Sequence, residues 1–256
     1  MVWWFSIFVR GVADTTENYA FSLAYSVMPL GWGVVAFVNS RSWGGFKSSM
    51  GRALFFLGAG IFAWGVGNLI FGYYNLVLQV PVPYPSFADV GFILLYPLSA
   101  IGVLYLFRAI GVTSRIRKIS GKVGLLIIPI FFIFISYYLL VMVARAGVIT
   151  SNSDLLKGFL DVAYPVGDVV IIVLATIAYA LSFQLLGGIF KIPIIVILSS
   201  FVSFYLADFL FSYTTTVGTY YVGKWVDLFY PTAFLLIGIG LTMLSPNIIS
   251  RSSKND

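Results

Sequence analysis

The sequence predicts an all-α integral membrane protein, a single domain over residues 1–256 with seven transmembrane helices built from repeated proline-kinked hairpins. Three observations predict this fold class. Hydrophobic residues make up 60% of the chain and charged residues only 9%, whereas about a quarter of the residues of a soluble domain are charged. Long apolar stretches divide the chain. Inside them, four prolines recur at intervals of 68, 68 and 66 residues, namely Pro29, Pro97, Pro165 and Pro231.

Seven apolar stretches are long enough to cross a bilayer, whose hydrocarbon core is about 30 Å thick and requires about 20 helical residues. The predicted spans are residues 19–38, 53–77, 88–108, 123–144, 158–183, 192–213 and 226–245. Residues 1–18 are expected to form an external segment, anchored at the membrane interface by Trp3, Trp4 and Phe5. Residues 247–256 are expected to form a cytoplasmic tail, and no stretch remains for a separate soluble domain.

The distribution of positive charge predicts the orientation, because Lys and Arg are retained on the cytoplasmic side of a membrane. Eleven of the 15 Lys and Arg residues lie in the tail or in and beside the loops after spans one, three and five. The opposite side carries Arg10, Arg145, Lys157 and Lys224. The N-terminus is therefore predicted outside and the C-terminus inside. The net charge of +6 is interpreted as a sign of this topology rather than of nucleic-acid binding.

The proline spacing predicts an internal repeat. An interval of about 67 residues holds two spans and returns the chain to the same side, so all four prolines fall in helices that run from outside to inside. Proline removes a backbone hydrogen bond and kinks a helix, which opens a cavity or a hinge. Proline is also more frequent in membrane helices than in soluble ones. For any single proline, this general frequency is an alternative explanation to the repeat. The segment Gly67–Tyr73 resembles Ala207–Tyr213 at an offset of 140 residues.

Glycines cluster on two of the predicted spans. Small residues let membrane helices approach closely, so these glycines are interpreted as packing positions rather than ligand contacts. They are Gly58, Gly60, Gly65, Gly67 and Gly72 on the second span, and Gly238 and Gly240 on the seventh.

Several classes of function are disfavoured by what the sequence lacks. It contains no Cys and no His, the usual ligands of haem, zinc, copper and iron–sulfur centres, so no cofactor and no metal are expected. Nucleotide-binding loops and the common hydrolase and metalloprotease motifs are also missing. A retinal Schiff base would need a lysine within the last span, whereas Lys224 precedes it. The protein is therefore expected not to be an enzyme.

Acidic residues gather toward the predicted outer side. Five of the nine, Asp89, Asp161, Asp168, Asp208 and Asp227, lie in spans or at their outer ends. Asp161 and Asp168 share one helix face with Pro165 because of their spacing. Asp168 is the deepest, about 15 Å from the outer start of its helix. A charged Asp at a helix centre costs about 2.5–3.5 kcal/mol, so such a group usually faces the bundle interior, pairs or holds a proton.

These acids give the candidate ligand- or proton-binding residues, with Asp168 and Asp208 first. For these two, the alternative is a buried hydrogen bond to Tyr or Asn that fixes packing. For Asp89, Asp161 and Asp227, the alternative is a solvated residue stabilised by a helix N-terminus, with Arg145, Lys157 and Lys224 as external counter-charges. The full candidate set is Asp168, Asp208, Asp161, Asp227, Asn68, Tyr164, Tyr230 and Tyr96.

Five short segments carry a resemblance: Trp64–Asn68, Tyr73–Tyr74, Pro85–Asp89, Tyr96–Leu98 and Asp161–Asp168. Together they resemble the uncharacterised multi-span membrane region at the N-terminus of many prokaryotic signalling proteins. There the region precedes cytoplasmic PAS, cyclic-di-GMP-turnover or kinase modules. The resemblance covers about Arg52 to Leu181 and departs from the family at Asn68, where an acid is expected. It implies a sensory bundle, which would signal through a partner because no output module precedes Asp256.

The favoured expectation is a non-enzymatic seven-helix sensor or receptor-like module of the plasma membrane. It would have an outward-facing polar cavity and act through a protein partner in the membrane or at its cytoplasmic face. Two alternatives remain open. One is an accessory or anchoring subunit of a larger membrane complex, and the other is a small transporter or proton pathway that uses the intramembrane acids.

Overall fold

The computed structural model of the protein describes residues 2–111, 122–148, 155–185 and 190–252. All regular secondary structure in these ranges is helical. Within the described residues, six helical segments are long and apolar enough to cross a membrane. They are Thr16–Ser42, Ser49–Leu78, Phe87–Ala109, Leu155–Ile177, Lys191–Thr216 and Trp225–Met243. The chain is thus an all-helical protein with several helices of membrane-spanning length, as the sequence predicts.

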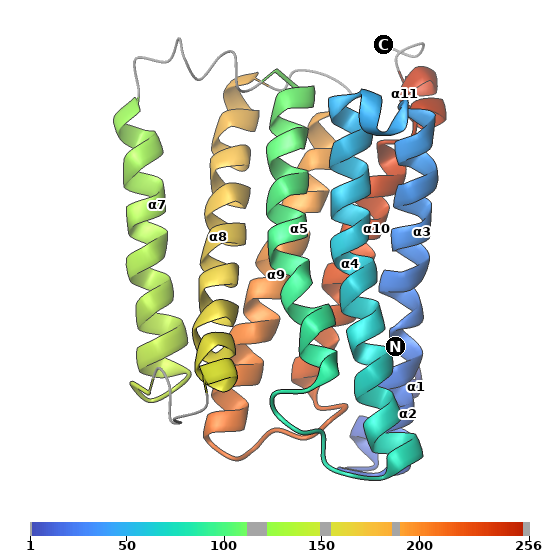
Figure 1. Cartoon of the computed structure of the whole chain (residues 1–256), viewed down its shortest axis with the longest axis vertical. Coiled ribbons are helices and arrows are strands. Elements are labelled where there is room, and N and C mark those ends of the chain that lie inside the picture. The colour runs from blue at the N-terminus through green and yellow to red at the C-terminus, as the bar shows by residue number, and fades with distance from the viewer. Residues whose placement is uncertain (1, 112–121, 149–154, 186–189, 253–256) are drawn as a thin grey trace.

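Figure 1 shows how the helices of the described residues are arranged. In chain order they are α1 (Val2–Val9), α2 (Thr16–Tyr25), α3 (Val27–Ser42), η1 (Gly45–Lys47), α4 (Ser49–Tyr73), η2 (Tyr74–Leu78), α5 (Phe87–Ala109), α7 (Lys122–Ser136), η3 (Tyr137–Val143), α8 (Leu155–Leu185), α9 (Lys191–Thr216), η4 (Trp225–Leu228), α10 (Phe229–Met243) and α11 (Pro246–Ser252).

Local sequence signals explain where the long helices begin and end. Gly44 has a φ of 84° after α3, a conformation that glycine adopts without strain. The hydroxyl of Ser48 then starts α4 by accepting a hydrogen bond from the Gly51 amide at 2.9 Å. Helix α5 starts in the same way, at Ser86. These caps fix the positions along the chain at which each apolar stretch becomes helical.

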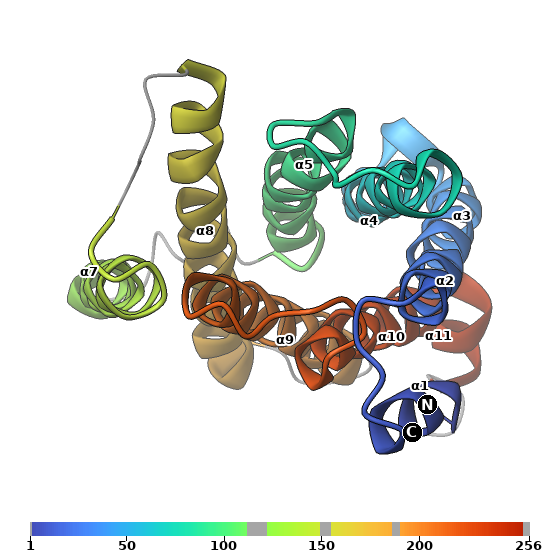
Figure 2. The ribbon, with the colours of Figure 1, turned by 90° about the horizontal axis from the view of Figure 1, so that it is seen from below.

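Six of the long elements surround a common interior. Helix α4 packs against α3 and α5, α10 packs against α9 and α3, and α8 packs against α5 and α9. Figure 2 shows this arrangement along the bundle, with α7 outside it and beside α8. The interior of the bundle is therefore bounded by helices that lie far apart in the sequence.

The apolar core is concentrated toward one end of the bundle. Leu54 and Leu57 near the start of α4, Leu106 near the end of α5 and Leu241 near the end of α10 are 0% exposed, and Ile194 near the start of α9 is 1% exposed. We call this the packed end. It lies at the top of Figure 1, close to α11.

The fourth predicted span, residues 123–144, coincides with α7 and η3. Within the described residues, its apolar helical stretch is Pro129–Val143, which is shorter than the six segments of membrane-spanning length. The structure thus supports six of the seven predicted spans. The fourth span, residues 123–144, stays a prediction, and so does the orientation.

The four evenly spaced prolines occupy two kinds of position. Pro97 and Pro165 lie inside α5 and α8. Pro29 and Pro231 are each the third residue of a helix, α3 and α10, where proline is tolerated because the first amides of a helix have no intrahelical partner. All four lie within segments of membrane-spanning length. The equivalence of the helices that carry them, like the internal repeat, stays a prediction.

The seven glycines assigned to packing lie against neighbouring helices. At each of them an added Cβ would come within 3.0 Å of an atom of another helix. At Gly238, for example, it would lie 2.2 Å from the Trp32 ring of α3, and at Gly67 it would lie 2.7 Å from the Ala88 carbonyl oxygen of α5. The interpretation of these glycines as close-packing positions is confirmed.

Candidate functional site

A cavity of about 800 Å³ lies at the end of the bundle opposite the packed end. It is formed where α4 and α9 end and where α5, α8 and α10 begin, beside the connector 79–86. We call this the cavity end. The structure brings all eight candidate residues together in the cavity lining: Asn68, Tyr96, Asp161, Tyr164, Asp168, Asp208, Tyr230 and Asp227.

The carboxylate of Asp208 on α9 receives hydrogen bonds from two tyrosines on other helices. The Tyr96 hydroxyl of α5 donates to Oδ2 at 2.8 Å, and the Tyr230 hydroxyl of α10 donates to Oδ1 at 2.8 Å. Both tyrosines immediately precede a proline in the sequence. Asp208 therefore links three helices at one point while remaining partly exposed to the cavity.

Asp168 on α8 lies beside Asp208 and is 4% exposed. Its carboxyl group is within hydrogen-bonding range of Asp208 and of the Tyr96 hydroxyl. A hydrogen bond between two carboxyl groups requires a proton on one of them, because an ionised carboxylate only accepts. The two acids thus lie side by side in the cavity lining, and the Asp168 side chain faces the interior of the bundle.

Asp89 caps α5 and also binds α8. Its Oδ2 accepts hydrogen bonds from the Ser86 amide at 2.7 Å and the Ser86 hydroxyl at 3.0 Å, a capping box that the Ser-x-x-Asp spacing explains. Its Oδ1 accepts a hydrogen bond from the Tyr164 hydroxyl at 2.7 Å. Asp89 is only 9% exposed, so its interpretation as a solvated residue is corrected, because the neighbouring α8 covers it.

Asp227 of η4 is likewise buried, at 1% exposure. The Gly223 amide donates to its Oδ2 at 2.6 Å, and the Tyr220 hydroxyl donates to its Oδ1 at 3.0 Å. Burial raises the pKa of the Tyr220 hydroxyl well above its usual value, and the Asp227 charge adds to this effect. Tyr220 thus remains a donor at neutral pH. The connector before η4 folds over Asp227, so the alternative of a solvated residue does not hold for it.

Asp161 lies at the rim of the cavity. Its Oδ1 accepts a hydrogen bond from the Tyr84 hydroxyl at 3.0 Å, and partial burial together with this bond raises the pKa of Tyr84. The Nη1 of Arg145 donates to the backbone oxygen of Asp161 at 2.6 Å. The ammonium group of Lys157 lies 5.7 Å from the centre of the Tyr84 ring. Basic side chains thus lie at the rim, while the deeper acids are bound by tyrosines.

Asn68 on α4 acts as a donor to the first span. Its Nδ2 binds the Ser22 carbonyl oxygen at 2.8 Å and the Ser26 hydroxyl at 2.7 Å. One helical turn earlier, Trp64 forms an aromatic wall of the cavity, with its ring centre 5.5 Å from that of Tyr230. The i, i+4 spacing of Trp64 and Asn68 puts both on one face of α4.

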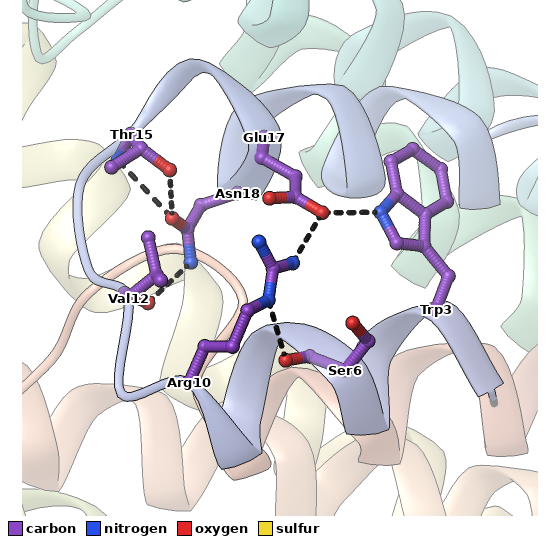
Figure 3. Close-up of polar contacts among 7 residues, drawn as sticks. All are labelled: Trp3, Ser6, Arg10, Val12, Thr15, Glu17 and Asn18. Carbon is purple, nitrogen blue, oxygen red and sulfur yellow. Dashed lines mark hydrogen bonds and ion pairs between the residues drawn. The ribbon is translucent and has the colours of Figure 1, made fainter.

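The N-terminal segment lies against the connector that covers Asp227. The Trp4 indole donates to the Gly223 carbonyl oxygen at 3.0 Å. Figure 3 shows how α1 and α2 are joined: the Arg10 guanidinium lies 2.6 Å from Glu17 Oε1, which also accepts from the Trp3 indole at 3.1 Å. Of the expected interfacial anchor, Phe5 is 61% and Trp3 41% exposed, whereas the Trp4 side chain is partly buried.

Sequence reasoning missed two contributions to the cavity. The sequence indicates Arg145 only as an external counter-charge, yet this residue is part of the lining. The aromatic wall of Trp64, Tyr25 and Phe92 was also not assigned to the site. The position of Trp64 one turn before Asn68 was the available signal for that wall. Nothing in the sequence indicates that Arg145 reaches α8.

The described lining joins aromatic side chains to five aspartates and one arginine. No group of acidic residues within the described ranges has the arrangement of a metal site. The lining is therefore suited to an organic molecule with both apolar and polar parts. Comparisons with protein-family models, with curated proteins and with solved structures give no match to this chain.

Proposed function

We propose that this protein is a non-enzymatic, receptor-like membrane module that binds a small molecule in the cavity and signals to a partner. One observation carries the proposal: a cavity of about 800 Å³ whose polar lining comes from α4, α5, α8, α9, η4 and α10. Small-molecule sites typically have volumes of about 300–1,000 Å³ and a few convergent polar groups. A ligand that contacts several helices at once favours one arrangement of those helices over others.

The contact between α5 and α8 supports the transmission of ligand binding from the cavity to the packed end. Tyr96 packs on Gly167, where an added Cβ would lie 2.4 Å from Cγ of the Tyr96 ring. Because the Tyr96 hydroxyl also binds Asp208, a ligand that replaces this hydrogen bond changes how the ring presses on α8. Both helices continue toward the packed end (Figure 1). A displacement at the cavity can thus reach the opposite face.

The proposal includes seven spans, with α7 and η3 as the fourth. The excess of Lys and Arg beside the connectors of the packed end, eleven of 15 in the sequence, supports a cytoplasmic packed end and an outward cavity in the cell membrane. The hairpin repeat also belongs to the proposal. Its support is that Tyr96, Tyr164 and Tyr230, each followed by a proline, all line the cavity.

A proton pathway is the second candidate, and the contact between Asp168 and Asp208 favours it. Two neighbouring carboxyl groups in the interior of a membrane bundle are suited to gain and release a proton. Reconstituted liposomes with a pH-sensitive dye distinguish the two functions. Proton flux that Asp168→Asn abolishes supports the pathway, and a receptor gives none.

Native mass spectrometry of the protein extracted in a mild detergent tests the proposed function. We expect a bound small molecule in the wild type and its loss in Ser212→Trp, because Ser212 lines the cavity and an indole fills space there. Ser42→Trp is the matched control, since Ser42 lies at the other end of the bundle and is exposed. Equal retention in both variants contradicts the proposal. A stoichiometric protein with no small molecule favours an accessory subunit.

A further inference from the structure

The charge of the cavity is strongly unbalanced. Five aspartates line it, at positions 89, 161, 168, 208 and 227, against Arg145 as the basic residue of the described lining. Arg145 itself donates to the Asp161 backbone at the rim. Even with one proton shared between Asp168 and Asp208, the described lining carries more negative than positive charge. An anionic ligand would be repelled, whereas a positive charge would be attracted.

Aromatic rings line part of the same cavity. Trp64 is surrounded by aromatic rings, with centre distances of 5.2 Å to Phe92, 5.5 Å to Tyr230 and 6.3 Å to Tyr25. All four of these residues line the cavity. Aromatic rings attract ammonium groups through the negative charge density of their faces, and tryptophan does so best.

Tyr230 connects the acids to the aromatic wall. Its hydroxyl binds Asp208 at 2.8 Å, and its ring lies beside that of Trp64. A cationic group near Tyr230 would therefore meet both a carboxylate and aromatic faces. Two tyrosine hydroxyls occupy only part of the acceptor capacity of Asp208, because a carboxylate has about four lone-pair sites.

Resting on the proposed function above, we infer that the ligand of this cavity is an organic cation, a protonated amine or quaternary ammonium group on an apolar body. The positive group lies between the Asp168–Asp208 pair and the rings of Trp64 and Tyr230. The apolar body fills the rest of the 800 Å³ cavity. The proposal assigns these four residues to binding and the rim residues Tyr84 and Arg145 to the entrance.

Thermal unfolding in a nonionic detergent, with three small probes, tests the inference. The probes are trimethylphenylammonium, its uncharged isostere tert-butylbenzene, and the anion phenylacetate. We expect the cation to raise the Tm of the wild type in a saturable way, the isostere to bind at least tenfold more weakly, and the anion to have no effect. Asp208→Asn should weaken the cation at least tenfold and leave the isostere unchanged.

Two further variants complete the test. Asp14→Asn is the matched control, because Asp14 is exposed and lies outside the cavity lining; it should bind the cation as the wild type does. Trp64→Leu replaces Asp208→Asn if the latter does not fold, and it should also weaken the cation selectively. Equal binding of the cation and its isostere overturns the inference but leaves a small-molecule cavity. Absence of any cation effect in the wild type overturns the inference as well. In that case the proposed function still stands if native mass spectrometry shows a small molecule bound to the wild type but not to Ser212→Trp.

Discussion

The two ends of the bundle are made by the same helices but are held together in different ways. At the packed end, Leu54, Leu57 and Leu106 are fully buried, and Gly102 brings α5 against α4. At the cavity end, tyrosine hydroxyls and aspartate carboxylates join the helices. Apolar contacts are non-directional and draw helices together, whereas hydrogen bonds fix a separation. An open space in such a bundle therefore depends on a polar framework around it.

Almost every buried polar side-chain atom among the described residues has a hydrogen-bond partner. Within the described residues, the Ser99 hydroxyl is the one buried side-chain polar atom without a hydrogen-bond partner. Ser99 lies in α5, between the two ends. A buried group without a partner costs about 1–3 kcal/mol, so a complete network at the cavity end keeps the opening compatible with a stable fold.

Gly102→Ala should produce the largest effect, because it disrupts the packed end. An added Cβ would lie 2.7 Å from Leu57 Cγ and 2.9 Å from the Leu57 backbone nitrogen. Overpacking typically costs about 1–3 kcal/mol, and a backbone neighbour cannot move aside. We expect the free energy of unfolding to fall by about 3 kcal/mol, measured by thermal unfolding in detergent.

Gly31→Ala is the control for this prediction. Nothing lies within 4 Å of a Cβ added at Gly31, and alanine favours a helix more than glycine does. Its stability should equal or slightly exceed that of the wild type. Equal stability of the two variants would remove the contrast between the ends.

Tyr230→Phe should have the next largest effect, because it weakens the framework of the cavity end. The change removes the donor 2.8 Å from Asp208 Oδ1, and hydrogen bonds to charged groups contribute about 1.5–3 kcal/mol. We expect a loss of about 2 kcal/mol in the same measurement. Tyr73→Phe, at a side chain that is 50% exposed, should leave the Tm unchanged. An unchanged Tm in Tyr230→Phe would show that the framework is not needed.

Ser99→Ala should raise stability, since it removes an unsatisfied hydroxyl without opening a large space. The expected gain is about 1 kcal/mol. Ser200→Ala is the matched control on α9, where the hydroxyl donates to the Ile197 carbonyl oxygen at 2.6 Å. That variant should lose stability. Opposite signs in the two serine variants support the assignment of Ser99 as unpaired, and a loss of stability in both contradicts it.

Glu17→Gln should have the smallest effect. Its partner Arg10 lies 2.6 Å away, but both side chains are solvent-accessible, and exposed ion pairs contribute little. The Tm should change only slightly at low salt and not at all in 1 M NaCl, because salt screens exposed charges. A large change that persists in salt would mean that the junction of α1 and α2 supports the cavity end through Trp4 and Gly223.

Much of the architecture follows from the sequence because apolar stretches and glycines act locally. The stretches predict where helices run, and Gly67 and Gly238 indicate faces that must approach another helix. The position of Asp168 deep in an apolar stretch predicts an inward side chain, because lipid excludes a charge. These inferences need only the residue type and its distance from the end of a span.

The partners of each side chain could not be predicted in the same way. Tyr96 and Tyr230 meet at Asp208 although they lie 112 and 22 residues from it, and that meeting depends on how α5, α9 and α10 pack. Asp89 and Asp227 are buried because other segments cover them, which spacing within one helix does not reveal. The position of a proline within its helix depends on where that helix begins. Because the 3₁₀ turn η4 ends at Leu228, α10 begins at Phe229 and Pro231 is its third residue.

Trp64 gives the cavity a native optical reporter. It is 6% exposed, lies 4.6 Å from the buried Phe234 ring and also lines the cavity. An indole changes its emission when the polarity or charge beside it changes. Subtracting the spectrum of Trp64→Phe from that of the wild type isolates this signal from the other five of the six tryptophans. Ligand binding in the cavity can then be followed by tryptophan fluorescence during a titration. The measurement needs no added label and works in detergent or in liposomes.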